Sequence, residues 1–481
     1  MRIKHIDGIR GISIIAVVLF HAFPNLFKYG YLGVDYFLVV SGFVISKRYF
    51  FEKNEFTFKD FWIKRIKRLF PSLLVCIILI TPISFGIMNT DFFENFLQSI
   101  IASLFGLNNF LLLLSTGYWN PANDFKPLYT TWSLGLEEQF YLLISILFFS
   151  IKAKPNNRKK FIISILIISF LSYIICITGT FNYQTFHYLM LPGRLWEFFI
   201  GVFASYFSTK KFNFPAFLSP LALSSIILFL LFDFFASFIA PKPIFILPLL
   251  SVGFLCLDKK ESICSRILSF KPLNYIGMAS YSIYLYHQPL LSFARLNSFD
   301  KLDNQSLLFI IFCSFLLGII MYELIEKRKL YNTFLNKIVK LKNLDVKKIF
   351  ISSIFISLIS FLSIINIEKF FRLRFSYLLI NGSIPQGFLG GKGYTDYPKK
   401  FINEVFKDNQ EGINLLFIGN SRIRDLINSF LTIKYINSEN FNIVYIRKFD
   451  SKNEIYQENI KKADIIFSQN LNINYNPNKS I

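Results

Sequence analysis

The sequence predicts an all-α polytopic membrane helix bundle of about 11 transmembrane helices, followed by a small C-terminal α/β fragment outside the cytoplasm. Two observations predict this fold class. Of the 481 residues, 53% are hydrophobic and 17% are charged, whereas about a quarter of the residues in soluble domains are charged. The apolar residues also come in long blocks, which suit a bilayer better than a soluble core.

Twelve apolar blocks are candidates for membrane helices because each is close to the length that spans a bilayer. Polar or basic segments separate them. The blocks lie near residues 9–25, 30–47, 69–88, 95–115, 134–151, 161–179, 193–208, 217–239, 243–257, 275–296, 306–325 and 348–367.

The basic residues lie in short segments between the apolar blocks, and this pattern orients a membrane protein in the bilayer. It accounts for the net charge of +22 without nucleic acid as a partner. If all basic segments are cytoplasmic, one block must fail to cross. The block at 95–115, interrupted by Asn108 and Asn109, is the best candidate for a re-entrant or interfacial segment. Eleven spans then place the N-terminus in the cytoplasm and the C-terminal region on the other side of the membrane.

Composition changes after the last apolar block, where Gly and Asn become frequent and long apolar runs stop. Residues 413–419 and 441–446 are short apolar runs typical of buried strands, so an α/β unit is expected there. The predicted segments are a membrane domain at 1–330, a basic loop with the final helix at 331–367, a linker at 368–412, and a partial α/β region at 413–481.

Ionisable side chains inside membrane segments are costly, so each is a functional candidate. Arg10 and His21 are eleven residues apart on the first predicted helix, which is about 16 Å along the axis. Eleven steps of about 100° place both on nearly the same face. Imidazole suits proton transfer near neutral pH. A hydrogen bond between helices is the competing interpretation of His21, and both stay open on spacing alone.

Further ionisable residues lie at membrane depth. Arg194 and Glu197 are spaced i,i+3 and can pair on one helix face. A structural ion pair and a substrate contact are equally open for them. The four histidines form no local metal motif, so no metal site is predicted. The other residues of this kind are Asp35, Glu137, Glu138, His287 and Glu323.

A basic run precedes the third predicted helix. Arg65 and Arg68 are i,i+3 neighbours, as are Lys64 and Lys67. Four cations at a helix start suit an anion with several phosphates, and guanidinium groups suit phosphate best. A plain topological anchor is the alternative, and spacing alone slightly favours it.

Six segments, in this order, carry a resemblance. They are Ile6-Asp-Gly-Ile-Arg-Gly11 with His21, Gly30-Tyr-Leu-Gly-Val-Asp-Tyr-Phe-Leu-Val-Val-Ser-Gly-Phe43, Arg65-Ile-Lys-Arg68 with Pro71, Trp132-Ser-Leu-Gly-Leu-Glu-Glu-Gln-Phe-Tyr141, Arg194-Leu-Trp-Glu197, and Ser280-Tyr-Ser-Ile-Tyr-Leu-Tyr-His-Gln-Pro289. Over about residues 5–330 the chain resembles the integral-membrane acyltransferase family (acyltransferase 3 type). That family includes the O-acetyltransferases of lipopolysaccharide O-antigen, capsule and peptidoglycan.

The resemblance implies the reaction and the donor. Acyl-CoA, usually acetyl-CoA, would bind from the cytoplasm as a substrate, and no cofactor would be bound permanently. Arg65 and Arg68 would hold its phosphates, while His21 would carry out acyl transfer with Arg10 assisting. Whether His21 acts as a base or takes the acyl group itself is open.

The resemblance also implies the acceptor and the compartment. The acceptor would be a sugar hydroxyl of a surface polysaccharide or its lipid-linked precursor, and the protein would lie in the bacterial inner membrane. Glu137 would belong to the catalytic or acceptor site. The expected substrate-binding residues are Asp35, Arg194, Glu197 and Tyr281.

The C-terminal region weakly resembles the SGNH-type hydrolase-like domain that some members of the family append. Its first motif is usually Gly-Asp-Ser, whereas Gly419-Asn-Ser-Arg422 stands here. No histidine follows His287 in the sequence, so a Ser-His-Asp triad cannot form within this region. The region is expected to be truncated or degenerate, and Ser421 is a weak candidate for a nucleophile.

Two other functions fit part of the pattern. A transporter, or a flippase for a glycan precursor, would also have many spans with buried charges. Transporters often carry paired broken helices in matching halves, and the sequence has no such pairing. A surface esterase built on the C-terminal region is the third hypothesis, and the missing histidine argues against it.

Overall fold

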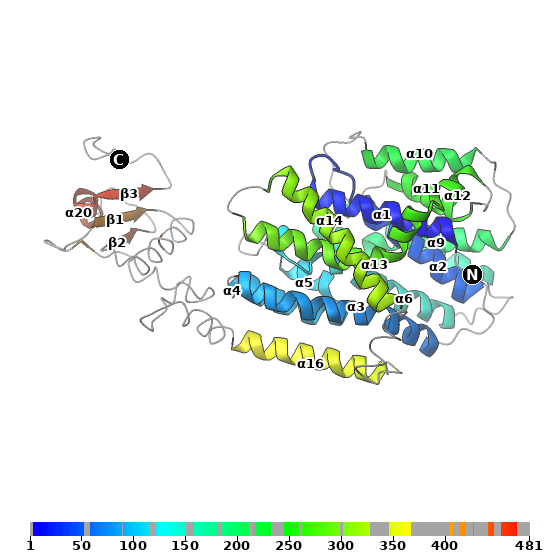
Figure 1. Cartoon of the computed structure of the whole chain (residues 1–481), viewed down its shortest axis with the longest axis horizontal. Coiled ribbons are helices and arrows are strands. Elements are labelled where there is room, and N and C mark those ends of the chain that lie inside the picture. The colour runs from blue at the N-terminus through cyan, green and yellow to red at the C-terminus, as the bar shows by residue number, and fades with distance from the viewer. Residues whose placement is uncertain are drawn as a thin grey trace. The chain divides into compact units, whose positions relative to one another are not determined.

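The protein is described from a computed structural model with two parts, a helical part and a smaller part that holds the strands (Figure 1). The helical part comprises residues 1–87 and 95–361, and the smaller part comprises residues 88–94 and 362–481. The structure describes residues 3–51, 58–88, 90–115, 122–150, 158–179, 184–210, 215, 217–231, 245–258, 262–298, 302–327, 346–366, 405–406, 413–418, 427, 441–446 and 454–468.

Each of the twelve apolar blocks falls on one or more helices, so the helical fold class is confirmed. The longer helices are α1 (Lys4–Ala22), α2 (Leu32–Ile45), α3 (Phe58–Ile87), α4 (Thr90–Leu104), α6 (Trp132–Ser150), α7 (Arg158–Gly179), α9 (Leu191–Ser208), α10 (Leu218–Leu231), α11 (Ile246–Cys256), α13 (Lys271–Leu296), α14 (Asn304–Met321) and α16 (Val346–Ile365). The short helical segments are η1 (Ser46–Phe51), α5 (Asn108–Leu114), η2 (Asn123–Phe125), η3 (Tyr129–Thr131), α8 (Gln184–Leu189), α12 (Ile263–Leu268) and η6 (Tyr322–Glu326).

The block at 95–115 is two helices, α4 and α5, separated by a break at Gly106. Gly106 has a φ of 68°, a conformation that glycine adopts at little cost. Asn108 then starts α5 and donates hydrogen bonds to the Leu128 carbonyl (2.9 Å) and the Thr131 hydroxyl (2.8 Å). The predicted interruption is therefore present. A re-entrant path through the bilayer stays a prediction, and so does the count of eleven spans.

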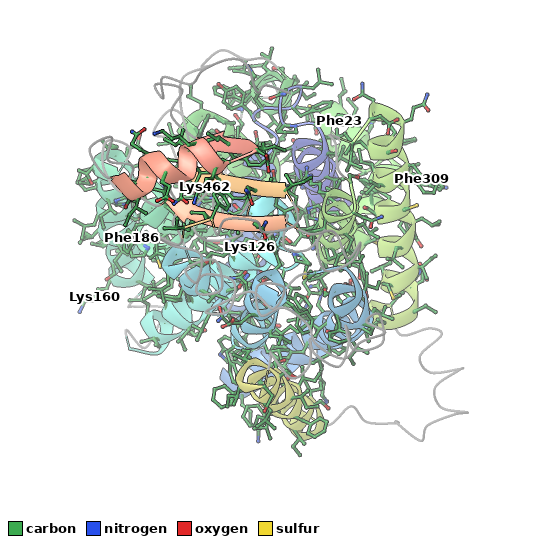
Figure 2. All side chains as sticks on the ribbon, turned by 90° about the vertical axis from the view of Figure 1, so that its left-hand side faces the viewer. Phe23, Lys126, Lys160, Phe186, Phe309 and Lys462 are labelled. Atoms are coloured by element: carbon green, nitrogen blue, oxygen red, sulfur yellow. The ribbon has the colours of Figure 1, made fainter. Side chains whose placement is uncertain are left out.

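By length and composition, four of the described helical segments are long and apolar enough to cross a membrane: Lys4–Ala22, Phe61–Ile87, Lys159–Thr178 and Asn304–Glu326. They differ in their surroundings. Within the most apolar window of each, 67% of Lys4–Ala22 is buried but only 17% of Asn304–Glu326. Figure 2 shows Phe309 of α14 pointing outward, and its side chain is 67% exposed. We infer that α1 lies inside the bundle, while α14 presents apolar side chains to lipid.

Glycines let the central helices approach each other closely. A Cβ atom on Gly277 of α13 would lie 1.7 Å from the Asp7 carbonyl oxygen of α1. A Cβ atom on Gly201 of α9 would lie 1.9 Å from the Val39 carbonyl oxygen of α2. Small residues allow such close backbone packing between membrane helices. These crossings hold α13 against α1 and α9 against α2.

Replacing Gly277 with alanine is expected to destabilise the bundle, because the new methyl group has no room beside the α1 backbone. Overpacking of this kind costs about 1–3 kcal/mol. Gly86→Ala is the matched control, since a Cβ atom at Gly86 meets nothing within 4 Å. The measurement is the thermal unfolding midpoint of purified protein in detergent. Equal midpoints for the two variants would contradict the predicted close contact.

The smaller part contains a parallel sheet with the strand order β2-β1-β3. Its strands are β1 (Ile413–Ile418), β2 (Phe441–Ile446) and β3 (Ile465–Ser468), and α20 (Glu454–Lys462) lies between β2 and β3 in sequence. The two strands predicted from sequence are confirmed, and β3 was missed. Ser421 and most of the predicted linker at 368–412 lie outside the described residues.

Candidate active site

A cavity of about 150 Å³ lies among helices α1, α2, α3, α6 and α13. Its lining combines apolar side chains with charged and hydroxyl groups, so it can receive a ligand that has both kinds of surface. The polar side chains that line it are Arg10, Ser41, Arg65, Arg68, Ser133, Glu137, Tyr141, Ser280, Tyr281 and Tyr284.

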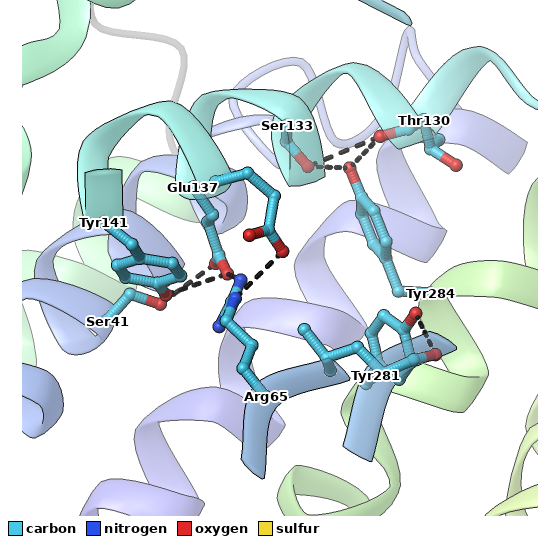
Figure 3. Close-up of polar contacts among 10 residues, drawn as sticks. Ser41, Arg65, Thr130, Ser133, Glu137, Tyr141, Tyr281 and Tyr284 are labelled. Carbon is cyan, nitrogen blue, oxygen red and sulfur yellow. Dashed lines mark hydrogen bonds and ion pairs between the residues drawn. The ribbon is translucent and has the colours of Figure 1, made fainter. Parts of the chain in front are cut away.

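Arg65 of α3 forms ion pairs with two carboxylates of α6. Its Nε donates to Glu138 (2.9 Å) and its Nη2 donates to Glu137 (3.0 Å). Its guanidinium carbon lies 3.8 Å from the ring centre of Tyr141. Glu137 also accepts hydrogen bonds from the hydroxyls of Ser41 and Tyr141, each 3.0 Å long. Figure 3 shows Arg65 reaching from α3 into this group, so Arg65 fixes the position of Glu137.

Arg10 and Arg68 line the same cavity but have no such partners among the described residues. The Arg10 guanidinium carbon lies 5.9 Å from the ring centre of Phe37. Neither guanidinium makes a hydrogen bond or a close ion pair with any residue that the structure describes. Guanidinium groups without a close partner beside a partly apolar cavity favour an anionic ligand. These two residues are the part of the cavity best suited to hold phosphate.

Two tyrosines of α13 connect the cavity walls. The Tyr281 hydroxyl donates to the Leu69 carbonyl of α3 (2.9 Å). The Tyr284 hydroxyl lies 2.8 Å from the Thr130 carbonyl and 2.7 Å from the Ser133 hydroxyl (Figure 3). Tyr281 lines the cavity, while the substrate-binding role expected for it from the resemblance stays a prediction. The two residues hold α13 against α3 and α6.

His21 lies on α1 with Arg10, and the helix is unbroken between them. His21 is not among the described residues that line the cavity. Its ring centre lies 5.3 Å from that of His287 and 6.2 Å from that of Tyr129, and Arg295 donates to its backbone carbonyl. Burial, with a smaller contribution from Asp124, raises the pKa of Tyr129 to about 12, so this hydroxyl stays neutral near His21.

Asp35, Arg194 and Glu197 form a separate buried cluster. Arg194 lies 2.5 Å from Asp35 and 3.1 Å from Glu197, so the i,i+3 pair expected from the sequence is present. Exposure of these side chains is at most 2%, and none of the three lines the cavity. The cluster connects α2 to α9, while the substrate-binding role expected for it stays a prediction.

One residue near these groups, Glu326, was not identified as a candidate from the sequence, whereas His287 was. Glu326 lies on the π-helix η6 and accepts a hydrogen bond from Ser282 (2.5 Å). It also interacts electrostatically with Arg10 and Arg68. His287 is completely buried beside His21. A π-helix turn often marks a functional site, but nothing in the sequence around Glu326 predicts one.

Charged side chains around a cavity inside a bundle of apolar helices are typical of a polytopic membrane protein, and such groups are candidates for a functional site. Among the described residues, no three of His, Cys, Asp and Glu are grouped to hold a metal ion. The chain belongs to the acyltransferase domain family, whose model matches residues 3–324. The resemblance drawn from the six sequence segments is thereby confirmed.

Several known proteins are similar to this chain. The peptidoglycan O-acetyltransferase OatA of Listeria monocytogenes is 30% identical over 309 residues, which are 60% of this chain and 49% of that protein. A putative O-acetyltransferase of Staphylococcus aureus strain COL is 28% identical over 342 residues, 67% of this chain and 56% of that protein. The chain thus spans about half the length of these relatives. No solved structure matches it.

Proposed function

We propose that this protein is a membrane O-acetyltransferase that transfers an acetyl group from acetyl-CoA to a sugar hydroxyl of a cell-surface polysaccharide. The acyltransferase family and the names of the relatives support this reaction class. The name of the Listeria relative favours a peptidoglycan-type acceptor. A lipopolysaccharide or capsule acceptor rests on the family resemblance alone.

The observation that carries the proposal is that the guanidinium groups of Arg10 and Arg68 line one cavity and make no hydrogen bond or close ion pair with any described residue. Acetyl-CoA carries several phosphates and a long arm that ends in the thioester. We assign the phosphates to Arg68 and Arg10, because the neighbouring Arg65 already has Glu137 and Glu138 as partners. The sequence expectation that Arg65 binds phosphate directly becomes, in this proposal, a role in positioning Glu137.

The chemistry is assigned to His21. One nitrogen of its ring takes the proton of the sugar hydroxyl while the hydroxyl oxygen forms a bond to the acetyl carbon. The carbon–sulfur bond then breaks, and the thiolate receives the proton and leaves as CoA. Arg10 lies on the same helix, about 16 Å away along the axis, so the donor would extend along α1 from its phosphates to its thioester.

This arrangement implies a topology. Basic segments flank α1 and α3 on one side, so we place the N-terminus and the donor phosphates at the cytoplasmic side of the bacterial membrane. His21 lies near the other end of α1 and would meet a glycan from outside. The C-terminal region would also be outside, where it could bind the acceptor.

The proposal predicts that cations of the cavity, and not cations near it, bind the donor. Arg10→Gln and Arg68→Gln are each expected to weaken CoA binding about 10- to 100-fold, since hydrogen bonds to charged groups are worth about 1.5–3 kcal/mol. Lys64→Gln is the matched control on α3, because Lys64 is exposed and does not line the cavity. The measurement is CoA affinity by titration calorimetry on the purified full chain.

The acceptor is tested in cells. Mass spectrometry of purified surface glycans, with and without the gene, should show a difference of one acetyl group, removable by mild base. Unchanged glycans together with unchanged CoA affinity in both arginine variants would overturn the proposed function.

A further inference from the structure

His287 of α13 is a buried imidazole to which the proposed reaction assigns no role. Its side chain is fully buried. Its Nδ1 lies 2.8 Å from the Tyr284 carbonyl oxygen and 3.3 Å from that of Ile283. A carbonyl oxygen only accepts hydrogen bonds, so Nδ1 carries the proton in the neutral ring. Nε2 is then a lone-pair acceptor, and it has no partner among the described residues.

The ring of His21 lies at the distance that a hydrogen bond between two imidazoles requires. An N–H···N bond of about 2.9 Å places two such ring centres roughly 5 Å apart. The ring centres of His21 and His287 are 5.3 Å apart, with the ring planes inclined by 54°. No hydrogen bond joins the two rings among the described residues, so a bond between them would require rotation of the His21 side chain.

The backbone around the pair is held in place from α13. Arg295 donates to the carbonyl of His21, and Ser292 donates to the Phe125 carbonyl (2.7 Å) in the segment that also holds Tyr129. This arrangement fixes the end of α1 relative to His287. A fixed backbone leaves ring rotation as the movement needed to join the rings.

We propose that His287 is a positioning residue whose Nε2 accepts a hydrogen bond from the N–H of His21, fixing the tautomer of His21 for acyl transfer. This inference rests on the proposed function of His21. With one His21 nitrogen donating to His287, the other nitrogen holds the lone pair that takes the hydroxyl proton. The acidic partner of a catalytic histidine in hydrolases acts in the same sense, through orientation and tautomer. His287 itself takes no proton from the substrate.

A purely structural role and a positioning role for His287 make opposite predictions about the variants His287→Asn and His287→Gln. The hydrogen bonds that the structure gives His287 run from Nδ1 to backbone carbonyls. The amide of His287→Asn can replace Nδ1 but reaches no further. The amide oxygen of His287→Gln reaches the place of Nε2 and can accept from His21. A structural role therefore favours Asn, and a positioning role favours Gln.

The experiment compares wild type, His287→Asn and His287→Gln as purified full chains of known thermal stability. The first readout is the rate at which diethyl pyrocarbonate modifies His21, followed by peptide mass spectrometry. It reports the nucleophilicity of His21 and needs neither donor nor acceptor. The second readout is the kcat and the KM for acetyl-CoA in acetyl transfer to purified peptidoglycan.

We expect His287→Gln to stay near wild type in both readouts. His287→Asn should slow the modification of His21 about tenfold, the effect of one hydrogen bond, and lower kcat about 100-fold with KM unchanged. The reverse order, or equal modification rates in the two variants, would overturn the inference and leave the transferase intact. If the modification rates are as expected but neither wild type nor either variant transfers acetyl, the His21–His287 pair would be supported and the proposed function rejected.

Discussion

Replacing His21 with alanine is expected to lower acetyl transfer by about 10²–10⁴-fold, the range that a positioned general base contributes. The loss follows whether the imidazole removes the hydroxyl proton or carries the acetyl group, because alanine can do neither. CoA binding should persist, since Arg10 and Arg68 line a cavity that does not include His21. The measurement is base-labile acetyl on the surface glycan, together with CoA affinity of the purified variant.

His187→Ala is the matched control for this prediction. His187 lies on α8, only partly buried, and its Nδ1 has no hydrogen-bond partner among the described residues. The His187→Ala variant should keep full acetyl transfer. A flippase or transporter predicts a different result for His21→Ala, namely loss of glycan export with no specific loss of acetyl. Normal export with acetyl-free glycan would separate the enzyme from the transporter.

The helices of this protein could be predicted from its sequence because a bilayer demands long apolar segments. The break at Gly106 could also be predicted approximately, because Asn108 and Asn109 interrupt an otherwise apolar block. The strand β3 was missed because Ile465–Ser468 has only four residues. A run that short carries too little alternation to distinguish a strand from a loop.

The candidate site could be predicted residue by residue but not as an arrangement. Arg65 and Arg68 look equivalent in the sequence, three residues apart on one helix. The structure separates them, because Arg65 faces the carboxylates of Glu137 and Glu138, 72 and 73 residues away. Spacing along one helix determines which side chains share a face. It does not determine which distant helix packs against that face.

The Asp35 contact illustrates the same limit. The Arg194–Glu197 pair follows from i,i+3 spacing, whereas the shorter contact of Arg194, to Asp35, joins residues 159 positions apart. The ring contact between His21 and His287 also joins distant helices, α1 and α13. Both contacts depend on close helix crossings. Glycines allow those crossings, but a glycine in the sequence does not indicate which helix will pack against it.

Arg194→Met is expected to destabilise the protein by about 3–5 kcal/mol, the usual cost of removing one partner from a buried ion pair. The side chain of Arg194 is completely buried between two carboxylates, those of Asp35 and Glu197. Without the guanidinium, two anions would face each other in a medium of low dielectric constant. The measurement is the thermal unfolding midpoint of the purified protein in detergent.

Two comparisons make this last prediction specific. Arg266→Met removes an exposed arginine of α12 and should leave the midpoint unchanged. Neutralising the carboxylates as well, in the triple variant Arg194→Met, Asp35→Asn and Glu197→Gln, should recover part of the lost stability, because no unpaired charge remains buried. If Arg194→Met instead unfolded at the temperature of Arg266→Met and lost only acetyl transfer, the cluster would be a substrate contact and not a link between α2 and α9.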